Sequence, residues 1–197
     1  MPKLFVALAF VLCAANSFAQ VPTVLGKTAD DWHLRLAMGD GQDRHLAAWA
    51  LAQSGKSADR WLLHQTHHPD PVVRYWLIQG LGRNAANEKT KDGREPYLKV
   101  LRKLLTDESP APRLAAADQL ARLGAVDEAM PVLIAGLDEP QDSAGMQAAA
   151  TLAALGKQAA PAQAKLQTAA ANGGEYVKRL ANRALQNLGV PSKNLEE

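Results

Sequence analysis

The amino-acid sequence predicts an all-α protein, an α-solenoid of stacked antiparallel helix pairs. Three observations lead to this prediction. Apolar residues make up 47% of the 197 residues but aromatic residues only 5%, and the many alanines among them favour closely packed helices. β-branched residues are sparse, which argues against strands. A pattern with helical spacing also recurs along the chain, as expected for a repeat protein.

The recurring pattern has five equivalent starting positions, which are Arg44, Arg74, Arg113, Gly145 and Lys178. Three residues after the start stands alanine or leucine, seven after it a leucine, and eleven after it a glycine in all units but the second. These offsets return to one face of a helix. We therefore expect helices in which the residue at offset three lies at a close contact, the leucine fills the core and the glycine forms a left-handed C-terminal cap.

Each of the first four repeated helices is followed by a second candidate helix, over residues 58–65, 96–106, 127–137 and 160–171. Turn sequences such as His68-Pro69-Asp70-Pro71 separate the units. The polar insertion over residues 87–93 is expected to form a solvent-exposed loop. Because one helix pair cannot bury its apolar face alone, we expect about four pairs and a terminal helix to stack.

The N-terminal residues 1–19 have the features of a signal peptide. A weakly basic start is followed by an apolar run, and Ser17 and Ala19 stand before a cut at Gln20. We divide the rest into a lead-in and capping helix (20–42), the repeat domain (43–190) and a disordered C-terminal tail (191–197). A periplasmic or extracellular protein is expected, with no membrane association after cleavage. The only cysteine, Cys13, would be removed, which leaves no disulfide and no thiol nucleophile.

The segment Asp70-Pro71-Val72-Val73-Arg74, with its following small residue and leucine, resembles the HEAT repeat family. The segment over residues 26–32 resembles the lead-in of bacterial HEAT modules, so the resemblance covers roughly residues 26–190. It implies a non-catalytic protein-binding or scaffolding module. The segments 73–76, 112–117 and 175–179 are similar to HEAT extensions found C-terminal to some bacterial sulfatases. This narrower resemblance implies an accessory part or a relative of a sulfatase-type hydrolase system.

Enzymatic alternatives are a sulfatase-related enzyme and a bilin-lyase-like HEAT enzyme. The stretch from Ser109 to Arg113 fits the loose sulfatase nucleophile motif. A sulfatase also needs several carboxylate and amide ligands for a divalent cation, and no such set surrounds these residues in the sequence. The same five residues are the expected turn between repeats. We therefore expect no catalytic residues and no cofactor.

Aromatic residues are concentrated in the first half of the chain. Tryptophan and tyrosine often anchor interfaces, so we expect an unidentified protein partner to bind at Trp76, Tyr75, Trp49 and Arg74. Trp76 is the best surface candidate because it lies off the helix face that carries the repeat pattern. The alternative, which the frequency of buried tryptophan in helical cores favours, is that these rings fill gaps between the first helices.

Three histidines, His64, His67 and His68, form a weaker candidate for a metal site. His64 and His68 stand one helical turn apart and could face one ion. The alternative is a helix C-terminus, where imidazoles meet free carbonyl groups. Pro69 ends the helix at this point, and a fourth ligand is not evident.

The charge distribution indicates neither nucleic acid nor a charged groove. The net charge is +2, and no cluster of lysine and arginine follows a surface as phosphate binding requires. The arginines at the repeat starts are instead expected to form ion pairs with an aspartate four residues earlier, Arg44 with Asp40 and Arg74 with Asp70.

Overall fold

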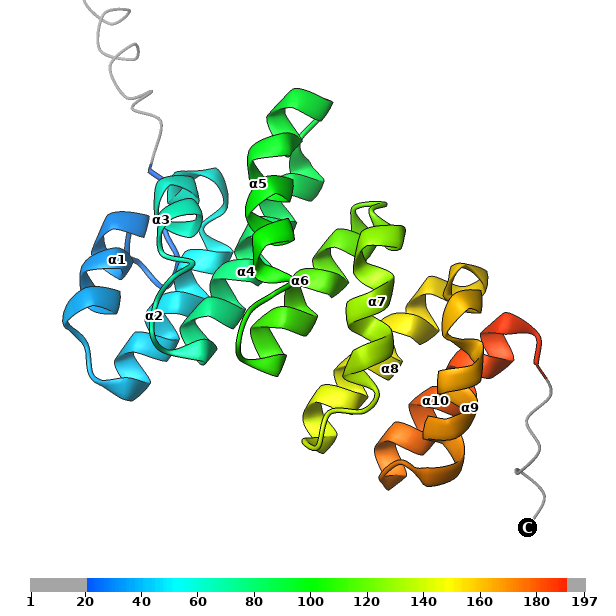
Figure 1. Ribbon diagram of the computed structural model, residues 1–197. Coiled ribbons are helices and arrows are strands. Elements are labelled where there is room, and N and C mark those ends of the chain that lie inside the picture. Colours follow the sequence, from blue (N-terminus) through cyan, green and yellow to red (C-terminus); the bar gives the residue numbers. More distant parts are fainter. Residues whose placement is uncertain (1–20, 191–197) are drawn as a thin grey trace, which may run out of the picture.

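The computed structural model describes residues 21–190, and both the predicted signal peptide and the predicted tail lie outside them. In this described part the regular elements are helices, and the one extended pairing is an isolated bridge between Val24 and Lys27. The helices stack in chain order from α1 at one end to α10 at the other (Figure 1). The predicted all-α solenoid is confirmed.

One layer of the stack consists of the helices that carry the repeated pattern, which we call the A helices. They are α2 (Gly41–Gln53), α4 (Pro71–Asn87), α6 (Pro110–Arg122), α8 (Asp142–Leu155) and α10 (Glu175–Leu188). Each A helix packs against the next. The residue at offset three is fully buried in all five helices, and the leucine at offset seven is at most 4% exposed. The predicted core face is therefore correct, and most of its close contacts are made by alanine.

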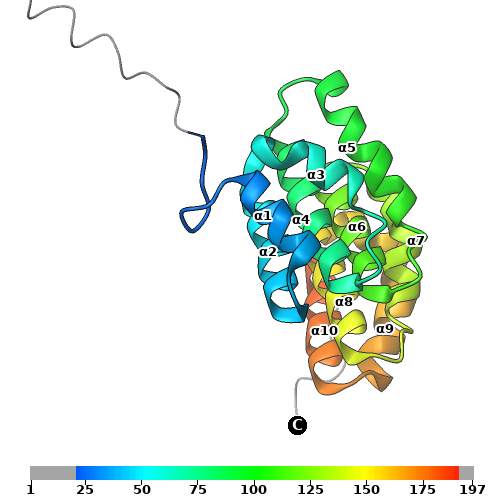
Figure 2. The same ribbon diagram turned by 90° about the vertical axis from the view of Figure 1, so that its left-hand side faces the viewer.

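The second layer consists of the B helices. They are α3 (Asp59–His64) with the short 3-10 helix Gly55–Ala58 before it, α5 (Lys91–Leu104), α7 (Val126–Gly136), and α9 (Gln163–Asn172) with the 3-10 helix Gly156–Ala162 before it. α5 packs against α4 and α6, and α7 packs against α6 and α8. α1 (Ala29–Met38) covers α2 at the N-terminal end, as Figure 2 shows in a view from that side. Of the helices just named, none is long and apolar enough to cross a membrane.

The ends of the A helices follow the glycine pattern. The glycines at offset eleven, Gly55, Gly124, Gly156 and Gly189, all have positive φ angles, between 56° and 92°. This backbone region favours glycine because it has no Cβ atom. The second unit has Ala85 at this position, and there the helix continues to Asn87. The presence or absence of the glycine thus sets where each A helix ends.

The insertion over residues 87–93 is not the loop that the sequence predicts. α4 extends through Asn87 and α5 begins at Lys91, so only residues 88–90 connect them. Thr90 caps α5 with its side chain, which stabilises an early helix start. Arg94 donates to the carbonyl of Ala85 near the end of α4 (Nε–O 3.2 Å). Because of these local hydrogen bonds, the polar residues from Lys91 onward form the exposed beginning of α5 and not a loop.

Candidate functional site

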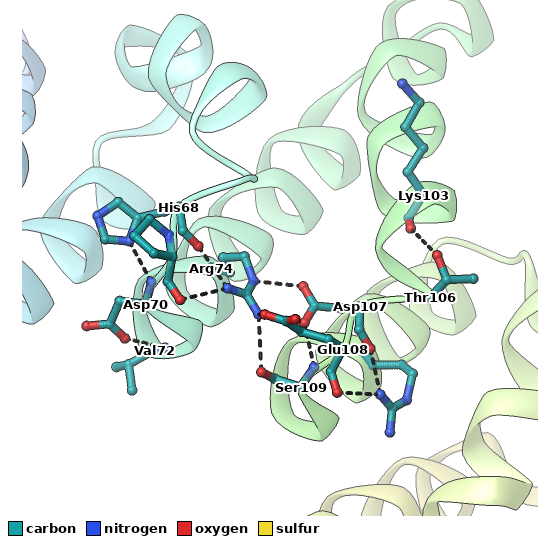
Figure 3. Close-up of polar contacts among 11 residues, drawn as sticks. His68, Asp70, Val72, Arg74, Lys103, Thr106, Asp107, Glu108 and Ser109 are labelled. Atoms are coloured by element: carbon teal, nitrogen blue, oxygen red, sulfur yellow. Dashed lines mark hydrogen bonds and ion pairs between the residues drawn. The ribbon is translucent and has the colours of Figure 1, made fainter.

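The repeat-start arginines connect neighbouring units. Arg74, in the first turn of α4, is only 5% exposed. Its guanidinium donates to both carboxylate oxygens of Asp107 (Nε–Oδ2 and Nη2–Oδ1, both 2.8 Å) and to the main-chain carbonyls of His68 and Pro69 (2.8 and 3.1 Å). Figure 3 shows Arg74 between the carbonyl of His68 and the carboxylate of Asp107. The turn before α4 is thereby joined to the turn before α6.

Arg113 repeats this arrangement one unit further along the stack. It donates to the carbonyls of Asp107 and Glu108 in its own turn and pairs with Glu139 in the turn before α8. In both units the carboxylate stands six residues before the start of the following unit, since Asp107 precedes Arg113 by six and Glu139 precedes Gly145 by six. Position six before the start is therefore a carboxylate position in these two units.

The predicted pairing of Arg44 with Asp40 and of Arg74 with Asp70 is wrong. Both aspartates are N-caps, and their carboxylates accept hydrogen bonds from backbone N–H groups in the first turns of α2 and α4. Asp70 also bonds the ring of His45 (2.7 Å). A side chain that caps its own helix is turned away from an arginine four residues later. The arginines therefore use carbonyls of the same turn and, in two units, a carboxylate of the next unit.

An apolar groove of about 370 Å³ lies between the first turns of α4 and α6. Its lining residues are Pro71, Val72, Tyr75, Trp76 and Ala111. The rings of Tyr75 and Trp76 meet edge to face, with their centroids 5.3 Å apart and an interplanar angle of 79°. Val72 is 40% exposed. An accessible hollow with a wholly apolar character and two aromatic rings is a candidate contact surface.

Two of the four predicted binding residues meet in this groove and two do not. Tyr75 and Trp76 line it side by side. Trp49, on α2, is half-buried, packs against the core and is not part of the lining. Arg74 is held in the ion pair with Asp107 and borders a different hollow. The half-burial of Trp49, Tyr75 and Trp76 means that the rings also fill space in the core.

Three residues of the groove lining, Pro71, Val72 and Ala111, are not among the binding residues predicted from the sequence. Val72 precedes Tyr75 and Trp76 by three and four residues, a spacing that places all three on one helix face. This signal was present in the sequence. Ala111 occupies in α6 the position that Val72 has in α4, and only the stacking of α6 on α4 brings it to the groove.

Further along the same two helices the surface becomes polar. A second hollow of about 280 Å³ is lined by residues that include Gln79, Asp118, Gln119 and Arg122. Gln119 donates to Gln79 (2.8 Å), and Arg122 donates to Asp118 (2.8 Å). The hydrogen bond to Asp118 raises the pKa of Arg122. The polar groups here are largely paired with one another, which makes this end of the α4–α6 surface hydrophilic.

A third hollow, of about 370 Å³, opens beside the Arg74–Asp107 pair between α3 and α5. Its lining combines apolar side chains such as Leu63 and Val100 with His67, Lys103 and Glu108. The charges at its rim have both signs. The lining of this hollow therefore favours no single class of ligand, whereas the lining of the apolar groove favours apolar side chains.

The predicted metal-binding histidines do not converge. Across the described span 21–190, no group of three or more His, Cys, Asp or Glu residues is placed to hold a metal ion. His64 ends α3 and is exposed, as is His67. The Nδ1 atom of His68 accepts the backbone N–H of Asp70 (3.0 Å). His68 therefore belongs to the turn before α4.

The stretch from Ser109 to Arg113 is predicted to be a turn between repeats, but only Ser109 precedes the helix, and residues 110–113 are the first turn of α6. Ser109 is the N-cap residue, and its hydroxyl accepts a hydrogen bond from Arg74 (3.2 Å). The backbone N–H of Ser109 donates to Asp107 (2.9 Å). These residues build the junction between two repeats. The predicted links to sulfatases and to a lyase stay predictions.

Comparison with known families finds a match to a family described as HEAT repeats, over residues 60–154. The matched span runs from within α3 into α8 and contains the apolar groove and the Arg74 and Arg113 junctions. A comparison with curated proteins finds no match. The repeated helix pairs, their buried faces and this match together show that residues 60–154 belong to the HEAT repeat family.

Proposed function

We propose that this protein is a non-catalytic binding module that holds a protein partner in the apolar groove between α4 and α6. The observation that carries the proposal is the accessible pair of Tyr75 and Trp76 beside the exposed Val72. Aromatic side chains at the centre of an interface contribute much of its binding free energy. The surrounding stack of helices serves as a rigid support.

The size and chemistry of the groove favour a protein segment with an apolar anchor. Its volume of about 370 Å³ lies near the lower end of the roughly 300–1,000 Å³ typical of ligand pockets. It suits one or two apolar side chains. Along the same helices Gln79 and Gln119 follow, so a partner that continues in this direction would present polar groups there.

The junction next to the groove supports binding by holding the groove's two walls in place. Arg74 precedes Tyr75 in α4, and its guanidinium bonds Asp107 and Ser109 in the turn directly before α6. The first turns of α4 and α6 are thus tied together before any partner arrives. A preorganised site loses less conformational entropy on binding.

Peptide selection tests the proposal. Peptides from a random library that bind the purified protein are expected to share an apolar residue, and Trp76→Ala is expected to weaken their binding by about tenfold or more. Val72→Asp, which places a charge in the groove without removing a ring, should have the same effect. The matched control is Leu46→Ala, because Leu46 is 40% exposed on α2 and lies outside the groove.

The result that would contradict the proposal is a set of peptides whose affinity is equal for the wild type, Trp76→Ala and Val72→Asp. Circular dichroism of each variant checks that it is folded.

We further propose that the protein acts outside the cytoplasm, in the periplasm or the extracellular medium. The proposal depends on the signal-peptide features of residues 1–19. N-terminal sequencing of the protein recovered from the cell envelope or medium is expected to begin at Gln20. A cell-associated protein that retains Met1 or Pro2 would contradict it.

A further inference from the structure

The first repeat keeps its arginine but lacks the acidic partner. Arg44 corresponds to Arg74 and Arg113, and like them it donates to the carbonyl five residues earlier, here that of Gly39 (3.0 Å). The carboxylate position of the following unit, six residues before its start, holds His68. Within residues 21–190, Arg44 forms no ion pair. Its guanidinium therefore has the local contacts of the repeat without the charge neutralisation.

His68 performs the structural part of the missing carboxylate's role. Its Nδ1 atom accepts the backbone N–H of Asp70, two residues later (3.0 Å). In the next unit Asp107 accepts the backbone N–H of Ser109, also two residues later (2.9 Å). The two turns are thus built alike, and the difference is the negative charge. Burial and the nearby Arg44 lower the pKa of His68, which favours the neutral form of the ring.

A hollow of about 220 Å³ lies at this incomplete junction, between α1, α2 and the turn before α4. Its polar lining residues are His33, Arg44, Gln65 and His68, and the remaining lining is apolar. No lining residue carries a carboxylate. The hollow thus combines one cation with imidazole and amide groups that can donate hydrogen bonds.

His33, which lines this hollow, has a buried ring nitrogen, Nδ1, without a hydrogen-bond partner among the described residues. The ring is held by stacking on Trp61, with centroids 3.5 Å apart and an interplanar angle of 7°. A buried polar atom without a partner costs free energy.

We propose that this hollow binds a carboxylate group of a ligand, which pairs with Arg44 as Asp107 pairs with Arg74 and Glu139 with Arg113 in the next two junctions. A hydrogen bond between a guanidinium and a carboxylate is among the stronger polar contacts in proteins. The hollow has room for a carboxylate with a short chain. Two sources share this chemistry, a small organic acid and an acidic side chain of a peptide. This site is separate from the Tyr75–Trp76 groove and does not depend on the proposed function.

Calorimetric titration at low ionic strength tests the proposal. The probes are succinate and the peptide acetyl-Ala-Ala-Glu-amide, with succinamide as the uncharged control. Both acids are expected to release heat with the purified protein, and succinamide is not. Arg44→Gln is expected to weaken binding of the acids at least about tenfold. Arg83→Gln is the matched control, because Arg83 is an exposed arginine that lies outside this hollow.

His68→Asp provides a second variant that does not depend on removing a side chain. The new carboxylate is expected to pair with Arg44 as Asp107 pairs with Arg74, so the variant should lose affinity for both acids. Its melting temperature should rise, because an internal ion pair replaces an unpaired guanidinium. If the His68→Asp variant is folded and no longer binds the acids, the loss of binding is due to the site and not to unfolding.

The proposal is overturned if neither acid binds the wild type, or if Arg44→Gln and His68→Asp bind the acids as well as the wild type does. If the peptide binds at least about tenfold more tightly than succinate, the natural ligand is an acidic side chain of a protein. If the two affinities are equal, the natural ligand is a small organic acid. Trp76→Ala should leave both affinities unchanged, so failure of the groove and failure of this site are distinguishable.

Discussion

At the scale of single residues, the buried pair of Arg74 and Asp107 decides how two repeats meet. Their side chains are 6% and 5% exposed, and the hydrogen bonds that Arg74 donates to Asp107 raise the pKa of Arg74. The carboxylate also accepts a hydrogen bond from the backbone N–H of Ser109, so neither charge is left without partners. Burial of two charges is tolerated when the geometry satisfies both of them. The pair therefore specifies the contact between α4 and α6.

Arg74→Ala is predicted to lower the free energy of unfolding by about 3–5 kcal/mol, because it leaves the carboxylate of Asp107 buried and unpaired. The control is Arg102→Ala. Arg102 pairs with Glu95 and Glu128 at the surface, and loss of such pairs costs under about 1 kcal/mol. Urea unfolding followed by circular dichroism measures both variants. Equal losses in the two would show that the Arg74 pair is no stronger than a surface pair.

At the scale of helices, small residues set how closely the A helices approach. Gly80 lies in α4 where this helix crosses α2, and a Cβ atom built there would be 2.8 Å from the Cα of Ala52 and 3.0 Å from Leu62. The nearest atom belongs to the backbone and cannot move aside as a flexible side chain could. The close approach of α2 and α4 thus requires glycine at this position.

Gly80→Ala is predicted to lower the melting temperature. Alanine would favour the helix by about 1 kcal/mol on propensity alone, but the overlap with the α2 backbone forces the helices apart and outweighs this gain. Gly41→Ala is the control, since nothing lies within 4 Å of its added Cβ atom, and it should leave the melting temperature unchanged or slightly higher. A higher melting temperature for Gly80→Ala would mean that α2 and α4 are less closely packed.

At the scale of the whole molecule, the N-terminal end of the stack depends on two partly buried histidines. His33 joins α1 to α3 through its stacking on Trp61, and His68 belongs to the turn into α4. Burial, together with Arg60 near His33 and Arg44 near His68, lowers the pKa of both rings from 6.5. The folded protein therefore binds protons less readily at these rings than the unfolded chain does.

The sign of the resulting pH dependence follows from this difference. A histidine with a lowered pKa in the folded state contributes its full stability above pH 6.5 and loses it as the pH falls through the folded-state pKa. The melting temperature is predicted to decrease between about pH 7 and 5.5. The double variant His33→Phe, His68→Gln should show a smaller decrease, and the exposed His64→Gln should behave as the wild type. Equal slopes for all three proteins, measured by calorimetry, would contradict the prediction.

The extent to which the sequence predicts each feature depends on the range of the interactions involved. The sequence alone predicts the all-α class, the five A helices, their buried face and the glycines at their ends. These features are local, because spacing along one helix decides which residues share a face. The loop over residues 87–93 was misjudged, because hydrogen bonds of Thr90 and Arg94 extend the helix there. Tyr75 and Trp76 were predicted as binding residues from composition and position, and the groove that they line was not predicted.

The sequence by itself determined that this protein is a stack of repeated helix pairs whose arginines stand at equivalent places. Only the tertiary structure decided what those arginines bind. Arg74 and Arg113 reach carboxylates 33 and 26 residues away in the chain, whereas Arg44 faces the hollow beside His68. The physical reason is that a local pattern sets the face of each helix, while the contacts between faces depend on how the helices stack.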